Sequence, residues 1–166
     1  MPSRAQACSY IELAFKLTFA AVATYVLWIE VAVIPMKVAS PLVGKFLFLT
    51  CQAIAIVALY ACGNLVCEAS RLLFSKRLEI LECFLLWMSC AVTGLAIFVL
   101  IMFYATCWFD PKYQDKLAEL EAEGLPMGFY SHLLHVPAVP FMCIDVMLVR
   151  RALLRGSIGT VVALHR

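Results

Sequence analysis

Three polar side chains stand within long apolar stretches of this sequence and could carry chemistry: Thr50, His132 and His135. The histidines occur in the segment YSHLLHVPAVPF three residues apart, a spacing that places both rings on one face of a helix. Such a pair can bind a metal, pair with a carboxylate, or transfer protons near neutral pH. Metal binding fits poorly, because no further histidine or carboxylate stands at a familiar ligand spacing.

Thr50 lies about one turn into an apolar stretch that begins at Phe46 (FLFLT). Its hydroxyl can bond to the carbonyl one turn back, which is common in membrane helices and has no chemical role. Beside a histidine the same hydroxyl is a nucleophile next to its base, because the imidazole can accept the proton. The residue alone leaves both interpretations open.

The composition indicates that these residues lie in a membrane. The chain is 64% hydrophobic and only 14% charged, with a mean hydropathy of +0.95, which lies outside the range of soluble domains. Crossing a hydrocarbon core of about 30 Å takes roughly 20 helical residues. The sequence therefore predicts an all-α, multipass transmembrane helical bundle as a single domain (1–166), with about four spans at roughly 17–35, 46–67, 83–109 and 129–149.

The first span has an alternative interpretation as the apolar region of a cleaved signal peptide, from Leu17 to Ile29. However, the apolar run resumes after Glu30, and no clear small-x-small cleavage site follows. A retained helix is the simpler prediction.

The fourth span is the least apolar, and its histidines and Asp145 are expected to face the bundle interior. Pro137 and Pro140 each remove a backbone donor, so carbonyls around Leu133 and Val136 are expected to lose helical partners. Irregular backbone at membrane depth usually lines a cavity. The sequence therefore predicts a break in this helix beside a cavity.

Basic residues predict the orientation, because loops rich in Lys and Arg face the cytoplasm. They precede the first span, separate the second from the third and follow the fourth: Arg4, Arg71, Lys76, Arg77, Arg150, Arg151 and Arg155. The loop 110–123 carries a net charge of −3 and belongs on the other side. Lys37 and Lys45 are discordant, but their aliphatic stems let both reach the headgroups. We expect both termini in the cytoplasm, and the protein in the endoplasmic reticulum or plasma membrane.

The acidic loop has a helical pattern of its own. Residues 115–123 (DKLAELEAE) have helix-forming composition, and the segment 124–126 (GLP) ends it. The sequence predicts a short helix along the membrane interface, either as a solvated connector or as a lid over a substrate site.

Depth links the hydroxyl to the imidazole. In the predicted orientation the second and fourth spans both run inward from the non-cytoplasmic face, with Thr50 about four residues and His135 about six residues from the start. At about 1.5 Å per residue the two residues lie within one turn of the same depth. Neighbouring helix axes lie about 8–10 Å apart, so the two side chains can meet if both face inward.

Several residues together resemble a known family: Lys45, Phe46, Phe48, Leu49, Thr50, Glu68, Asp110, His132, His135, Pro140, Phe141, Ile144 and Asp145. Over roughly 44–151 the chain is similar to the androgen-induced protein family, which includes the androgen-dependent TFPI-regulating proteins. Its members are multipass threonine hydrolases that cleave fatty acid esters of hydroxy fatty acids. The resemblance implies Thr50 as nucleophile, His135 as base, His132 in a supporting role, and no cofactor or metal.

Two departures from the family pattern stand out. If Lys45 and Phe46 are aligned with the family pattern without a gap, Phe48 falls at the position of the family's nucleophile. Shifting the alignment by two residues places Thr50 at that position and Glu68 at the family's acidic position. Family members also have further C-terminal spans, which the resemblance implies this chain lacks. The segment 157–164 (SIGTVVAL) resembles the opening of a fifth span.

The sequence therefore predicts a membrane-embedded hydrolase whose partners are the lipid bilayer and a lipid ester substrate. The alternative is a non-catalytic four-span scaffold or lipid-binding protein, in which Thr50 is back-bonded and the histidines are structural. Nucleic acid is not an expected partner, because the sequence has no basic patch or phosphate-binding loop. A channel is not expected either, because no filter motif or ring-forming charge is present.

Overall fold

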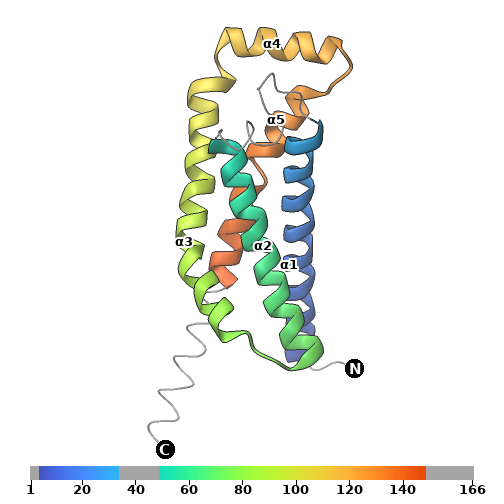
Figure 1. Cartoon of the computed structure of the whole chain (residues 1–166), viewed down its shortest axis with the longest axis vertical. Coiled ribbons are helices and arrows are strands. Elements are labelled where there is room, and N and C mark those ends of the chain that lie inside the picture. The colour runs from blue at the N-terminus through green and yellow to red at the C-terminus, as the bar shows by residue number, and fades with distance from the viewer. Residues whose placement is uncertain (1–3, 34–48, 149–166) are drawn as a thin grey trace, which may run out of the picture.

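The computed structural model describes residues 4–33 and 49–148, and every described element is a helix (Figure 1). In chain order these are α1 (Arg4–Trp28), the π-helical η1 (Ile29–Val33), α2 (Leu49–Phe74), α3 (Glu79–Met102), the π-helical η3 (Phe103–Trp108), α4 (Pro111–Ala122), α5 (Met127–His135) and a helix at 138–148. The predicted all-α fold class is confirmed. The start of the expected fifth span lies outside the described residues.

Within the described residues, four helical stretches are long and apolar enough to cross a membrane: Tyr10–Ala32, Leu49–Phe74, Glu79–Trp108 and Met127–Leu148. They fall on the four predicted stretches. Helix α1 extends before residue 17, and the charge on Lys16 is neutralised inside the bundle, where its Nζ lies 2.9 Å from Glu68 Oε2 on α2. A charged residue with such a partner is tolerated within a span.

Small residues let the spans pack closely. Ala20 and Ala23 on α1 and Ala61 on α2 are buried in one core cluster that joins α1, α2, α3 and the helix at 138–148. A Cβ atom at Gly63 would lie only 3.0 Å from Leu85 Cδ2, so this glycine permits the close approach of α2 to α3. Close contact through small residues is the usual way for helices to associate in lipid, where apolar burial alone gives no driving force.

The polar side chains of the fourth span face inward, as predicted. Ser131, His135 and Asp145 are all buried, whereas large apolar side chains such as Trp87 and Leu59 are exposed on the outside. This distribution fits a bundle surrounded by hydrocarbon, because exposed apolar side chains are at no disadvantage there.

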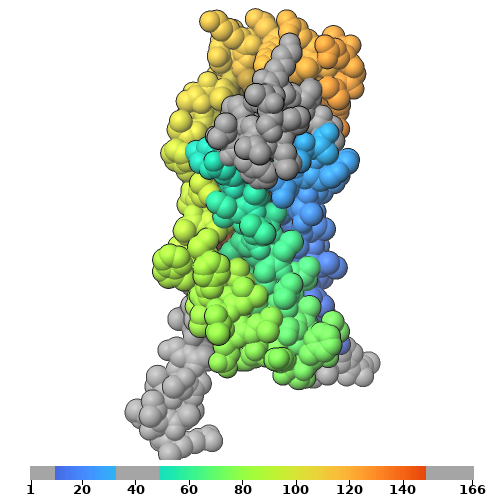
Figure 2. Space-filling model, viewed as in Figure 1, coloured from blue at the N-terminus to red at the C-terminus, as the bar shows by residue number. Residues whose placement is uncertain are grey.

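The acidic helix α4 lies across one end of the bundle (Figures 1 and 2). It begins at Pro111, earlier than the predicted residue 115, because Asp110 caps it by accepting a hydrogen bond from Lys112 N at 3.1 Å. The basic connection between α2 and α3, with Lys76 and Arg77, lies at the opposite end. The charges are therefore separated as the orientation prediction requires, and which end faces the cytoplasm stays a prediction. Lys37, Lys45, Arg150, Arg151 and Arg155 lie outside the described residues.

The fourth span is broken at residues 136–137, as the prolines predicted. Pro137 has no N–H to donate to the carbonyl of Leu133, so the helix cannot continue through it. The prediction that the Val136 carbonyl also loses its helical partner was wrong. Val136 O accepts from Val139 N at 3.3 Å, because a tighter turn supplies the bond that Pro140 cannot.

Candidate functional site

His135, the last residue of α5, is held as an oriented and buried imidazole. Its side chain is 8% exposed, and its Nδ1 lies 2.6 Å from the carbonyl oxygen of Ser131. Because a carbonyl oxygen only accepts hydrogen bonds, Nδ1 carries the proton and Nε2 keeps its lone pair. The ring stacks on Phe103 with the centroids 3.7 Å apart and the planes 10° from parallel. The hydrogen bond sets the tautomer, and the stack sets the plane of the ring.

The aromatic partners of both histidines come from the π-helical segment η3. Phe103 stacks on His135, Tyr104 Oη lies 2.7 Å from His132 Nδ1, and the Trp108 ring lies 4.2 Å from the His132 ring between centroids. A π-helix has more residues per turn than an α-helix, so it rotates the side chains that follow and brings a different set to the interior. The rotation turns three aromatic residues within six positions toward the fourth span.

His132 and His135 lie on one helix face, as the spacing predicted, and both contact η3. The half-buried His132 ring is hydrogen-bonded to Tyr104 in the third span, and its supporting role stays a prediction. This bond ties the third and fourth spans together beside His135.

Tyr113 connects α4 to the same end of the bundle. Its hydroxyl lies 2.9 Å from Ser131 Oγ, and its ring meets Phe103 edge-on at 6.0 Å. Burial raises the pKa of Tyr113 and the nearby charges of Cys107 and Glu30 raise it further, against an opposing effect of the Ser131 hydrogen bond. The phenol is therefore a persistent hydrogen-bond donor or acceptor at neutral pH. Ser131 thus connects α4 to His135: its hydroxyl contacts Tyr113 on α4, and its carbonyl oxygen accepts from His135.

Sequence reasoning missed the aromatic partners Phe103, Tyr104 and Tyr113. The signal that could have indicated two of them is the aromatic cluster FYATCW at the end of the third span. Tyr113 gave no signal, because it lies in a segment whose acidic composition indicates exposure to water.

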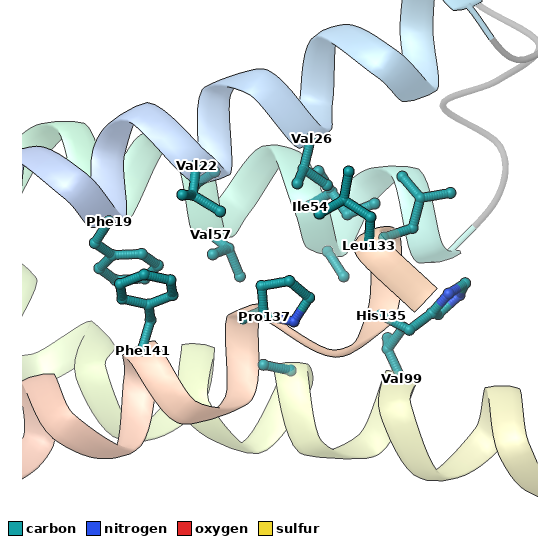
Figure 3. A pocket seen from close by; sticks show the side chains of 15 residues that line it. Phe19, Val22, Val26, Ile54, Val57, Val99, Leu133, His135, Pro137 and Phe141 are labelled. Atoms are coloured by element: carbon teal, nitrogen blue, oxygen red, sulfur yellow. The ribbon is translucent and has the colours of Figure 1, made fainter. Parts of the chain in front are cut away.

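An apolar cavity of about 30 Å³ lies among the four spans, and among the described residues His135 is the one titratable side chain that lines it. The walls are aliphatic side chains from every span, with Pro137 at the helix break. Figure 3 shows His135 at one end of this cavity and the stacked rings of Phe19 and Phe141 at the other. The predicted association of the proline break with a cavity is confirmed.

Thr50 is the second residue of α2 and is half-buried. Ala53, Ile54 and Val57 line the cavity, and offsets of three, four and seven residues place Thr50 on that same face of α2. Thr50 itself does not line the cavity, and the structure, which describes both residues, shows no hydrogen bond between Thr50 and His135. Thr50 therefore lies on the cavity-facing side of α2, and its direct pairing with His135 stays a prediction.

A second polar cluster lies nearer the other end of the bundle. Lys16 Nζ lies 2.9 Å and Arg71 Nη2 lies 2.6 Å from the two oxygens of the buried Glu68 carboxylate. Tyr60 donates a hydrogen bond of 2.6 Å to Asp145. Two acidic residues on which the family resemblance rests thus join one span to another.

Over residues 4–33 and 49–148 the fold and the site define a class: an all-α membrane bundle with four candidate spans and a buried, oriented imidazole at one end of an apolar cavity. Comparisons with protein-family models, with curated proteins and with solved structures find no match. Membership of the androgen-induced family stays a prediction.

Proposed function

We propose that this protein is a membrane-embedded hydrolase that cleaves fatty acid esters of hydroxy fatty acids, with Thr50 as nucleophile and His135 as base. The observation that carries the proposal is the tautomer of His135: Nδ1–H is engaged by Ser131, so the free lone pair lies on Nε2. A neutral imidazole with one nitrogen anchored and the other available is the arrangement of a general base.

Three further observations support this choice. Thr50 shares a helix face with cavity-lining residues of α2, and the cavity is apolar enough to accept a hydrocarbon chain. The residues around Thr50 and His135 also resemble those of the androgen-induced family. An ester inside a membrane is a reasonable substrate because its alkyl chains partition into lipid by themselves.

The chemistry has two halves. His135 Nε2 takes the proton of Thr50, Thr50 Oγ1 attacks the ester carbonyl, and the hydroxy fatty acid leaves with the proton returned by the imidazole. Water then gives a proton to Nε2 and attacks the acyl-threonine, which releases the second fatty acid and restores the hydroxyl. Imidazolium forms transiently in both halves. The face of Phe103, stacked on the ring at 3.7 Å, stabilises that positive charge.

Turnover by purified protein in lipid nanodiscs tests the proposal. Thr50→Ala and His135→Ala are each expected to lower hydrolysis of a branched hydroxy-fatty-acid ester by about a thousandfold, and Thr50→Ser to restore part of it. Thr93→Ala is the matched control, because Thr93 also lies in a span but donates its hydroxyl to Ser89 O at 2.7 Å. Labelling by a fluorophosphonate should need both Thr50 and His135. Equal turnover by wild type and Thr50→Ala would rule out this nucleophile.

The second candidate is a non-catalytic four-span scaffold or lipid-binding protein. One observation favours it: a ring that is stacked, hydrogen-bonded and buried, as His135 is, also meets every requirement of a structural residue. The same experiment separates the two candidates. Absence of both turnover and labelling in a wild-type protein that is folded and monodisperse supports the scaffold.

A further inference from the structure

We propose that the apolar cavity binds the end of a single acyl chain, and that the stacked pair Phe19 and Phe141 forms the floor that limits how far the chain enters. Binding in this cavity does not depend on catalysis. The consequence for substrate chain length rests on the proposed hydrolase function.

The lining of the cavity favours an apolar occupant over ordered water. A buried water needs about two to four polar partners, and the side chains that line this cavity supply one titratable group, His135. Apolar cavities remain dry and bind apolar molecules. The apolar molecule that surrounds a four-span bundle is the acyl chain, so the cavity fits a hydrocarbon segment with its functional group near the imidazole.

The floor of the cavity is built from two spans. The rings of Phe19 on α1 and Phe141 on the helix at 138–148 are 5.0 Å apart between centroids and 2° from parallel. Phe15 supports them, with its ring centroid 5.7 Å from that of Phe141. Phe141 follows His135 by six residues across the Pro137 break, and the two side chains lie at opposite ends of the cavity (Figure 3). The cavity volume of about 30 Å³ accommodates only a short section of an acyl chain.

The cavity is smaller than its proposed ligand, so a wall must move when a chain enters. Its volume of about 30 Å³ is roughly what two water molecules require. The break at Pro137 provides the movement, because no α-helical hydrogen bond crosses from the Pro137 nitrogen to Leu133. Phe141 lies four residues beyond this break. We infer that a chain enters when α5 moves away at this break, while Phe141 stays in place as the floor. His135 and Ser131 both lie on α5, so their hydrogen bond is kept.

Two variants that change the cavity in opposite directions test the proposal. Phe141→Ala opens the floor, and Val57→Phe fills the cavity from α2. The probe is a fatty acid that carries a photoreactive diazirine and an alkyne handle, incubated with the protein in nanodiscs. We expect cross-links to peptides that contain Val57 or Phe141. The Val57→Phe side chain should keep part of the probe out of the cavity, and each methylene group of the probe that is kept out should reduce the labelling by about fourfold.

Phe98→Ala is the matched control, because Phe98 is an exposed ring on the outer face of α3. It should leave the labelling pattern unchanged, and thermal unfolding should show that all variants are folded. Labelling that is insensitive to both Phe141→Ala and Val57→Phe in folded protein would overturn the inference.

A hydrolysis series separates this inference from the proposed function. With esters of increasing acyl length, Phe141→Ala should shift the preferred length upward, and Val57→Phe should shift it downward. Thr50→Ala should abolish hydrolysis and keep the probe labelling. If labelling follows the cavity variants while no variant hydrolyses esters, the acyl site stands and the hydrolase proposal fails. If wild type hydrolyses esters but chain preference ignores both variants, the floor assignment fails.

Discussion

Tyr60 and Asp145 meet inside the bundle through a hydrogen bond of 2.6 Å from the phenol to the carboxylate, joining the second span to the fourth. Asp145 is 1% exposed, and its other carboxylate oxygen has no hydrogen-bond partner among the described residues. Burying a polar group in lipid costs free energy unless the group is paired. This single hydrogen bond therefore provides much of the stabilisation that offsets the burial of Asp145. The pair anchors the half of the fourth span that follows the proline break.

Removing the phenol hydroxyl should therefore destabilise the protein. Tyr60→Phe is expected to cost about 1–3 kcal/mol, because it leaves the Asp145 carboxyl without its donor. Thermal unfolding in a mild detergent measures the loss. Tyr25→Phe is the control, since Tyr25 is exposed and should tolerate the change. The double variant Asp145→Asn with Tyr60→Phe should lose less free energy of unfolding than the sum of the losses in the two single variants. Equal unfolding temperatures for Tyr60→Phe and Tyr25→Phe would contradict the assigned role.

The stack of Phe103 on His135 should matter for rate more than for binding. Phe103→Leu keeps an apolar side chain but removes the aromatic face that stabilises the imidazolium. An aromatic contact of this kind contributes about 0.5–1.5 kcal/mol, so kcat should fall by up to about tenfold with little change in KM. Phe98→Leu, on the lipid-facing side of α3, should leave both parameters unchanged. A change in KM alone would show that Phe103 acts on substrate binding instead.

The attachment of α4 should weaken at high pH through Tyr113. Because the folded protein raises the pKa of Tyr113 above its usual value of 10.0, the protonated phenol contributes stability that is complete below that value. This contribution is lost as the pH rises through the higher folded pKa. Hydrogen exchange of α4 amides, corrected for the intrinsic pH dependence, should therefore increase above about pH 10 in wild type. Tyr113→Phe should lack this component, and an identical profile in both proteins would refute the role.

The charge separation between the two ends gives a topology test. A glycosylation acceptor inserted after Lys116, in the acidic helix, should be modified if this end faces the lumen. An acceptor inserted between Lys76 and Arg77, at the opposite end, should stay unmodified. Modification of the second site alone would invert the predicted orientation. Neither insertion touches the cavity, and circular dichroism should show that each protein remains helical.

Much of this architecture could be predicted from the sequence because hydropathy acts locally. Each span is a run of apolar residues long enough to cross lipid, and each end carries charges that lipid excludes. The break at Pro137 was predictable for the same reason, since the missing N–H belongs to the residue itself. The inward direction of Asp145 followed from the cost of exposing a carboxyl to hydrocarbon.

The contacts of the candidate site could not be predicted, because they depend on helix rotation. The π-helical turn at Phe103 changes which side chains face the fourth span, and no local composition specifies that change. The pairing of Lys16 with Glu68 depends on how two helices meet, although the residues lie 52 positions apart in the chain. Whether Thr50 meets His135 also depends on helix rotation, and their pairing stays a prediction.

The interruption at residues 136–137 divides the fourth span between two sets of neighbours. The segment before it is tied to the third span and α4 through Tyr104 and Tyr113, and the segment after it to the second span through Asp145. The fourth span therefore consists of two segments that meet at the Pro137 break and are held by different neighbours. On the acyl-site proposal, the first segment, with both imidazoles, moves toward the surrounding lipid while Asp145 keeps the second in place. A hydrocarbon chain then enters from within the leaflet, and only the packing of the first segment changes.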